Sequence, residues 1–228
     1  MSSDSDKELL LKKEVVKAAK AIYQKGLVEN NEGNVSVRNG RKEEIFITPT
    51  ANQYETLTED QIVHLAFDGT PLSSGKLPST EAKLHLAIYK ARPKVRCVIH
   101  THSTYATIVS VVRKSIPILM EEQVIYLGGA INIAPYGEAH TQNLAESALK
   151  ALSYKNGSLL ANHGVIVCGK STTEAIKFAE LIEKLAKIYW GALHIGEPFI
   201  LDNQNLEQFK NMFKKLFANC PRSMLKNI

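Results

Sequence analysis

Three histidines and one glutamate in this sequence have the residue types and the spacing that a divalent metal ion requires. His100 and His102 stand two residues apart in the β-rich run VIHTHS. Alternate side chains of a strand point to the same face, so these two imidazoles can bind one ion. A His-x-His pair alone is a weak signal, because histidines also occur singly in protein cores and on surfaces.

Two further residues strengthen the metal hypothesis. His163 lies in the apolar run LLANHGVIV, where a neutral imidazole needs a partner, although a backbone carbonyl would also serve. Glu81 lies at the start of a predicted helix, where the helix dipole alone also favours an acid. Three imidazoles and one carboxylate suit Zn²⁺, and Mn²⁺ or Co²⁺ could use the same ligands. A ligand set with one displaceable member is typical of a catalytic zinc.

The remaining histidines carry weaker signals. His85 follows Glu81 by four residues and shares its helix face, so it could hydrogen-bond to a metal ligand without binding the metal itself. The pattern favours an ordinary structural or surface histidine at this position. His64, His140 and His194 have no supporting context, and the sequence assigns them no function.

Three short polar segments are candidates for binding an anion. They are Gly33-Asn34-Val35-Ser36, Thr48-Pro49-Thr50-Ala51 and Ser79-Thr80, each at a predicted strand end or helix start. Backbone N–H groups and hydroxyls at such places bind phosphate. Each segment alone is more often only a turn or a cap. Together with the predicted metal and the basic net charge, they indicate a phosphate ester as the ligand.

Composition places the chain among soluble globular proteins. Its 228 residues are 44% hydrophobic and 22% charged, which excludes long disorder, collagen and coiled coils. The apolar runs are too short to span a bilayer, and no signal peptide is expected. Three widely spaced cysteines, Cys97, Cys168 and Cys220, indicate free thiols in a reducing cytoplasm.

Net charge gives no support for nucleic acid as a partner. The formal charge is +5, but the lysines are spread along the chain rather than gathered in one tract. No nucleic-acid-binding motif is present, so we expect neither a nucleic acid nor a membrane as partner.

Hydrophobic periodicity and turn residues predict a mixture of helices and short strands. Asn39-Gly40 is a strong signal for a hairpin between NVSVR and EEIFIT. Ser79 or Thr80 can cap a helix that reaches about Lys90. Other helices are expected at 6–26, STYATIVSVVRK, QNLAESALKAL and 205–217, a helical turn at LTEDQIV, and strands at HLAFDG, VRCVIHTHS and INIAPY. GSLLANHGVIVCG is expected to form a buried strand pair or one long kinked strand.

The longest helix is expected to begin at a capping box. Ser171 and Glu174 form this box, and the helix runs to about residue 193. Its predicted apolar face consists of Ile176, Ala179, Ile182, Ala186 and Tyr189. Since we find no internal repeat and no linker, we expect a single domain over residues 1–228 with an α/β layered architecture.

The order of the motifs resembles the class II aldolase/adducin-head superfamily, and within it the fuculose-phosphate aldolases. PSTE, HTH and NHG in this order are specific, and the resemblance covers about residues 10 to 200. It implies a three-layer α/β/α sandwich with a central, mainly antiparallel sheet. The matching stretches are GNVSVR, ITPT, GKLPSTEAKLHLAIYKARP, VIHTHSTYAT, SIPI, APYG, LLANHGVIVCG and TTEAIKFAELIEKLAKIYW.

The resemblance also assigns roles to residues. It implies a zinc held by His100, His102 and His163, with Glu81 as a ligand at rest and as a base when substrate displaces it. It implies a homo-tetramer with active sites at the subunit interfaces. The substrate phosphate would lie against Asn34, Thr50, Ser79 and Thr80, and against the backbone N–H groups of Gly33 and Ala51.

Three positions depart from the family's pattern. Glu121 aligns where the fuculose-phosphate aldolases carry a tyrosine that protonates the aldehyde oxygen in a neighbouring subunit's site. Ala51 replaces the glycine of TPTG, and it keeps the amide but not the freedom to take positive φ. An aromatic residue expected after APY is absent from 137–140. These changes concern the aldehyde half of the substrate, for which residues 205–228 are a further candidate.

The expected activity is cleavage of a ketose 1-phosphate, of the L-fuculose 1-phosphate or 5-deoxypentulose 1-phosphate type, to dihydroxyacetone phosphate and a short aldehyde. Glu81, once released into an apolar site with a raised pKa, would shuttle the C3 proton. Glu121 of an adjacent subunit would handle the proton on the C4 oxygen. The alternative is a methylthioribulose-1-phosphate dehydratase, since those relatives carry a glutamate at the place of Glu121.

More distant alternatives remain open at this point. A sugar-phosphate 4-epimerase would need an aspartate and a distal tyrosine that we do not find, and a decarboxylase of a 3-oxo acid phosphate is another possibility. A non-catalytic adducin-like module would not require all four of Glu81, His100, His102 and His163.

Overall fold

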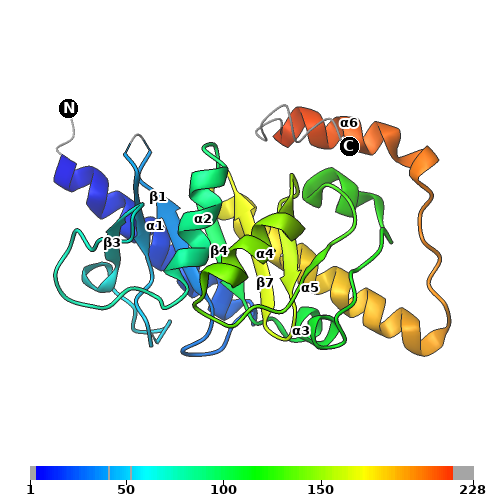
Figure 1. Ribbon diagram of the computed structural model, residues 1–228, viewed down its shortest axis with the longest axis horizontal. Coiled ribbons are helices and arrows are strands. Elements are labelled where there is room, and N and C mark those ends of the chain that lie inside the picture. Colours follow the sequence, from blue (N-terminus) through cyan, green and yellow to red (C-terminus); the bar gives the residue numbers. More distant parts are fainter. Residues whose placement is uncertain (1–3, 41, 52, 218–228) are drawn as a thin grey trace.

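Seven strands form one sheet in the computed structural model, which describes residues 4–40, 42–51 and 53–217 (Figure 1). The strand order is β3-β2-β1-β4-β7-β6-β5. Only the β5–β6 pair is parallel, so the prediction of a mainly antiparallel sheet is confirmed. The strands are β1 (Asn34–Arg38), β2 (Glu44–Ile47), β3 (Val63–Ala66), β4 (Cys97–Thr101), β5 (Ile133–Ala134), β6 (Gly157–Leu160) and β7 (Gly164–Gly169).

Helices cover both faces of the sheet, as Figure 1 shows. On one face, α1 (Asp4–Gln24), α3 (Thr104–Val111) and α5 (Thr172–Ile195) enclose the larger hydrophobic core. On the other face, α2 (Ala82–Ala91) and α4 (Gln142–Leu152) enclose the smaller one. Successive side chains of β4 point to opposite faces of the sheet, so Ile99 packs in the larger core and Val98 in the smaller one.

The last part of the chain adds a small peripheral layer. The helix α6 (Glu207–Phe217) follows the 3-10 turn η3 (Asn203–Leu206) and packs against the π-helical turn η2 (Gln123–Leu127). Phe213 of α6 is buried against Gly128, which has φ +91°. A further 3-10 turn, η1 (Glu59–Gln61), occupies the predicted helical turn of LTEDQIV.

Most predicted elements are confirmed. The Asn39-Gly40 hairpin pairs β1 with β2, STYATIVSVVRK contains a helix, and GSLLANHGVIVCG forms an antiparallel strand pair. INIAPY yields a strand of only two residues. No helix in the described part of the chain is both long and apolar enough to cross a bilayer. Cys97 and Cys168 are free and buried, and Cys220 lies outside the described residues.

Two details of the helices differ from the predictions. On α5, Ser171 accepts from the N–H of Glu174 as expected, but the Glu174 carboxylate accepts from the N–H of Lys170 rather than completing the box. The buried face of α5 is also wider than the predicted apolar face, because this helix packs against α1, α3 and the sheet at once. Ile176 and Tyr189 are only partly buried, and the buried residues are Ala175, Phe178, Ala179, Leu181, Ile182, Leu185 and Ala186.

The predicted cap of α2 is wrong. The residue at the N-cap position is Glu81, and neither Ser79 nor Thr80 caps the helix. Ser79 Oγ instead accepts a hydrogen bond of 3.3 Å from the N–H of Glu81. This places the Glu81 side chain at the helix entrance, where it is free to reach groups on the sheet.

Candidate metal centre

The central strands of the sheet bring the predicted ligands to one edge. In the ladders around β4, Asn34 of β1 is paired with His100, and Thr101 is paired with Val165 of β7. His102 follows the last residue of β4, and His163 precedes the first residue of β7, so the two lie side by side. His163 lies in the β6–β7 turn and is partly exposed, rather than enclosed in the apolar run as predicted.

Two glycines allow the backbone to approach these strands closely. Gly33 has φ +61°, and a Cβ atom there would lie 2.6 Å from the carbonyl oxygen of His100. A Cβ atom on Gly164 would lie 2.3 Å from the carbonyl oxygen of Thr101 and 3.1 Å from the ring of His102. Both glycines are therefore required by contacts with the His-x-His segment.

A bridge between two loops brings Glu81 to the same place. Pro49 and Pro78 form an isolated antiparallel bridge, in which the N–H of Thr50 donates to Leu77 and the N–H of Ser79 donates to Thr48. This bridge fixes the ITPT and LPST segments beside each other. It also places Glu81 at the entrance of α2, above the ends of β1 and β4.

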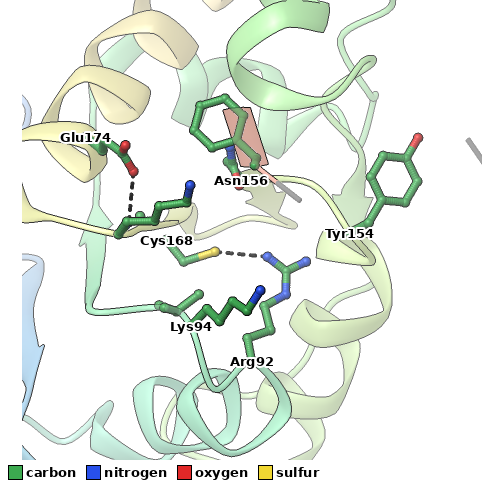
Figure 2. Close-up of a pocket in the computed structure, with 10 residues that line it drawn as sticks. Arg92, Lys94, Tyr154, Asn156, Cys168 and Glu174 are labelled. Atoms are coloured by element: carbon green, nitrogen blue, oxygen red, sulfur yellow. Dashed lines mark hydrogen bonds between the residues drawn. The ribbon is translucent and has the colours of Figure 1, made fainter. Parts of the chain in front are cut away.

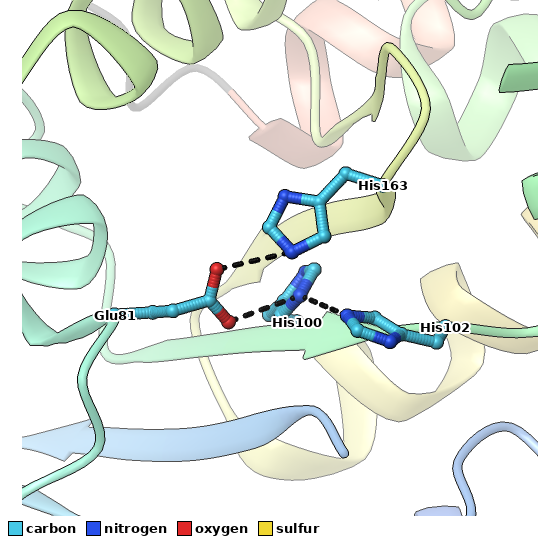
Figure 3. Close-up of side chains that lie close together, drawn as sticks. All are labelled: Glu81, His100, His102 and His163. Carbon is cyan, nitrogen blue, oxygen red and sulfur yellow. Dashed lines mark hydrogen bonds and ion pairs between the residues drawn. The ribbon is translucent and has the colours of Figure 1, made fainter. Parts of the chain in front are cut away.

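The four predicted ligands converge in the structure (Figure 3). His100 Nε2 lies 2.8 Å from His102 Nε2 and 3.1 Å from Glu81 Oε2, and His163 Nε2 lies 3.2 Å from Glu81 Oε1. One ligand atom from each of the four residues lies within 4.8 Å of all the others. Ligands about 2.1 Å from a tetrahedral ion stand about 3.4 Å apart, so shifts of a fraction of an ångström suffice to bind one.

The protonation of His100 shows that these groups fit a cation. Its Nδ1 donates to the carbonyl oxygen of Val165 at 2.8 Å, and burial lowers the pKa of His100 to about 3. The neutral ring therefore carries no proton on Nε2, which faces His102 Nε2 and Glu81 Oε2. The bare His100 Nε2 and the Glu81 Oε2 atom 3.1 Å away are both acceptors, and two acceptors in a buried site repel unless a cation lies between them.

The Glu81 carboxylate supplies the matching negative charge. Burial alone would raise its pKa, but the neighbouring imidazoles of His100 and His163 and the amide donor of Asn34 hold the pKa of Glu81 well below its ordinary value. Its Oε1 is buried without a hydrogen-bond partner. One carboxylate and three imidazoles form a ligand set that zinc takes in proteins.

A cavity of about 280 Å³ joins the ligand cluster to the predicted phosphate residues. Because the N–H groups of Thr50 and Ser79 serve the loop bridge, these two residues offer their hydroxyls to a ligand. The cavity is lined by all six predicted phosphate residues, Gly33, Asn34, Thr50, Ala51, Ser79 and Thr80, together with Glu81, His102 and His163.

Sequence reasoning missed two side chains of this cavity. His140 lines it with φ +70°, although its neighbours in the chain indicated no function for it. Glu32 also lines it, with Oε2 at 3.9 Å from His102 Nδ1, and its position directly before Gly33-Asn34 was the available signal. Glu121 is exposed and does not line the cavity within this chain, and neither does any described residue of α6.

Ala51 adopts the left-handed backbone that its residue type disfavours. Its φ is +52°, at the place where the family's pattern has glycine. We expect Ala51→Gly to raise the free energy of unfolding by up to about 1 kcal/mol, because strain at Cβ outweighs the added entropy of the unfolded chain. Thermal denaturation should show a small rise in Tm, and Ala87→Gly within α2 should lower it. A lower Tm for Ala51→Gly would contradict the strain argument.

A second cavity is too small for a substrate. It has a volume of about 30 Å³, enough for one or two water molecules, and shares no lining residue with the first (Figure 2). One of its basic groups, the guanidinium of Arg92, is already engaged, because it donates to the carbonyl oxygens of Lys155 and Ser153 and to Cys168 Sγ. Of these two cavities, the one beside Glu81 is therefore the better candidate for an active site.

The fold and this cluster define an α/β protein with a candidate metal centre at the end of its central strands. Comparison with known proteins identifies the family. The family model described as Class II Aldolase and Adducin N-terminal domain matches residues 13–190. The chain belongs to this family.

Individual relatives agree with this assignment. The L-fuculose phosphate aldolase of Escherichia coli K12 is 34% identical over 205 residues, which are 90% of this chain and 94% of the relative. A 5-methylthioribulose-1-phosphate/5-deoxyribulose-1-phosphate aldolase of Rhodospirillum rubrum is also 34% identical, over 206 residues that are 90% of this chain and 92% of the relative. The solved structure of an L-fuculose 1-phosphate aldolase superposes with a TM-score of 0.86 at 31% identity. The match covers 94% of this chain and 98% of the solved chain.

Proposed function

We propose that this protein is a zinc-dependent aldolase that cleaves a ketose 1-phosphate to dihydroxyacetone phosphate and a short aldehyde. The observation that carries this proposal is the cavity that joins Glu81, His102 and His163, three members of the four-residue ligand cluster, to a set of hydroxyls suited to phosphate. The names of the similar enzymes support a substrate of the L-fuculose 1-phosphate or 5-deoxypentulose 1-phosphate type.

Cleavage of the C3–C4 bond requires negative charge to be stabilised and two protons to move. The C4 hydroxyl loses a proton as it becomes the aldehyde, and the bonding electrons move toward the C2 carbonyl of the other half. A zinc ion, when bound, supplies the Lewis acid for this charge. His100, His102 and His163 would hold it, and Glu81 would be the displaceable ligand.

Glu81 has the position to move the proton at C3. It stands between the imidazoles and the hydroxyls of Ser79 and Thr80, all of which line or adjoin one cavity. If Glu81 is displaced from the imidazoles, it would lose the interactions that hold its pKa low, and burial would then raise its pKa. The protonated carboxyl can give C3 of dihydroxyacetone phosphate its new hydrogen.

The proton on the C4 oxygen requires another group. We assign it to Glu121 of a neighbouring copy in a homo-tetramer, because Glu121 is exposed and available to a partner. The same proposal includes a single domain that works in the cytoplasm. Mn²⁺ and Co²⁺ are the alternative metals.

A panel of ketose 1-phosphates tests the function. The protein with bound zinc is incubated with L-fuculose 1-phosphate, 5-deoxyribulose 1-phosphate and 5-methylthioribulose 1-phosphate. A coupled reductase assay detects dihydroxyacetone phosphate. We expect turnover of at least one substrate, and a chelator should abolish it. Absence of dihydroxyacetone phosphate with all three substrates would overturn the aldolase proposal.

The dehydratase is the second candidate, because a carboxyl group at Glu121 could assist the departure of hydroxide. Mass spectrometry of the product from 5-methylthioribulose 1-phosphate separates the two reactions. A product with an intact carbon skeleton that has lost one water would favour the dehydratase, and two carbon fragments would favour the aldolase.

The phosphate assignment makes a separate prediction. Thr50→Val removes one hydroxyl that we expect to donate to the phosphate, and a hydrogen bond to a charged group contributes about 1.5–3 kcal/mol. KM should therefore rise by about 10-fold or more, with kcat little changed, because this contact is equal in the ground and transition states. Thr172→Val, which removes a hydroxyl bonded to Glu14, is the matched control. A fall in kcat at unchanged KM would contradict the assignment.

A further inference from the structure

A ladder of polar side chains lies behind the metal cluster, between β1 and α2. Asn34 and Ser36 are two residues apart on β1, and Glu81, His85 and Tyr89 succeed one another at intervals of four along the entrance and body of α2. The interval of two places the strand residues on one face of β1, and the intervals of four place the other three on one face of α2. The two sets alternate in space, so that every contact of the ladder joins the strand to the helix.

The contacts of the ladder are short. Asn34 Nδ2 donates to Glu81 Oε2 at 2.9 Å, and Asn34 Oδ1 lies 2.5 Å from His85 Nε2. His85 Nδ1 lies 2.6 Å from Ser36 Oγ, which is 2.9 Å from the hydroxyl of Tyr89. His85 and Ser36 have no exposed surface, and Asn34 is only 3% exposed, so water cannot replace any of these partners.

The directions of the hydrogen bonds from Glu81 to Ser36 follow from Glu81. An ionised carboxylate only accepts, so the amide nitrogen of Asn34 faces Glu81 and its amide oxygen faces His85. His85 Nε2 must then donate, and its Nδ1 accepts from Ser36. Burial lowers the pKa of His85 to about 4, which agrees with a neutral ring that carries one proton.

We propose that His85 is a positioning residue, which holds the Asn34 amide so that Asn34 directs Glu81 toward the three imidazoles. Without the donor at His85 Nε2, the Asn34 amide could turn over and present its oxygen to the carboxylate. Glu81 would then lose a donor and gain a repelling oxygen. The inference rests on the proposed metal site, but its test does not require the proposed reaction.

Zinc affinity is the main measurement, made by competition with a chromophoric chelator on the full chain. We expect His85→Leu to weaken zinc binding by about 10-fold, which is the low end of what removing a metal ligand's own partner costs, because His85 acts on Glu81 through Asn34. His85→Gln should restore it to within about 3-fold, because its amide nitrogen reaches the place of Nε2. The matched control is His64→Leu, which removes another buried histidine that pairs with Glu44 away from this ladder.

A double-mutant cycle separates positioning from general stability. If His85 acts through Asn34, His85→Leu should have no further effect on zinc affinity in an Asn34→Ala background. Should His85→Leu not fold, His85→Asn replaces it, since the shorter amide reaches only the place of Nδ1 and should bind zinc less tightly than His85→Gln.

Three results would overturn the proposal. They are unchanged zinc affinity in His85→Leu, an equal loss in His64→Leu, and additive effects of the Asn34 and His85 substitutions. Zinc bound with the expected pattern but without ketose cleavage would instead reject the proposed function and leave the role of His85 supported.

Discussion

Replacing His102 with alanine is expected to remove the bound metal ion and to lower kcat/KM by about 10³-fold or more. His102 Nε2 stands 2.8 Å from His100 Nε2, so its loss opens the centre of the cluster. The two remaining imidazoles and Glu81 would bind zinc weakly, and the Lewis acid contributes several kcal/mol to the transition state. Metal analysis after dialysis and the coupled assay measure the two effects together.

The matched control for this substitution is His194→Ala. His194 lies in the last turn of α5, where it is exposed, contacts the ring of Trp190 at a tilted angle and does not line the cavity. Its replacement should leave zinc content and activity unchanged. Full activity of His102→Ala after complete loss of stoichiometric zinc would show that the reaction does not depend on this centre.

The substitution Glu81→Gln is expected to separate metal binding from proton transfer. Glutamine has nearly the same shape, and three imidazoles remain, so zinc should bind with reduced affinity and be restored by excess metal. The amide cannot carry the C3 proton, and loss of a general acid–base group lowers kcat by about 10²–10⁴-fold. KM for the ketose phosphate should change little, because the phosphate contacts are untouched.

The control for Glu81→Gln is Glu44→Gln. Glu44 is a partly buried carboxylate that also pairs with a histidine, His64, at 3.0 Å. The loss of such a pair alone should affect stability rather than kcat. Wild-type kcat in zinc-saturated Glu81→Gln would mean that another group moves the proton.

The common orientation of His100 and His102 could be predicted because its signal is local. The interval of two between them places both side chains on one face at the end of β4. Element boundaries follow equally local rules of turns and periodicity. These features depend on neighbours in the chain, and they survive folding almost unchanged.

What the sequence could not predict depends on partners distant in the chain. The cap of α2 was misassigned because the N–H of Ser79 bonds to Thr48 in the loop bridge. The Glu81 carboxylate, for its part, contacts His100 of β4 and His163 of the β6–β7 turn. His85 looked like an ordinary helix residue, since its partner Asn34 is 51 positions away. Glu32 and His140 reach the cavity only through the positions of their loops.

The most direct test of the central claim is anomalous X-ray diffraction from crystals of the protein grown with zinc. The account predicts one strong peak per chain, about 2.0–2.2 Å from Nε2 of His100, His102 and His163 and within reach of the Glu81 carboxylate. A zinc peak elsewhere in the chain, with these four side chains bound to no metal, would contradict it.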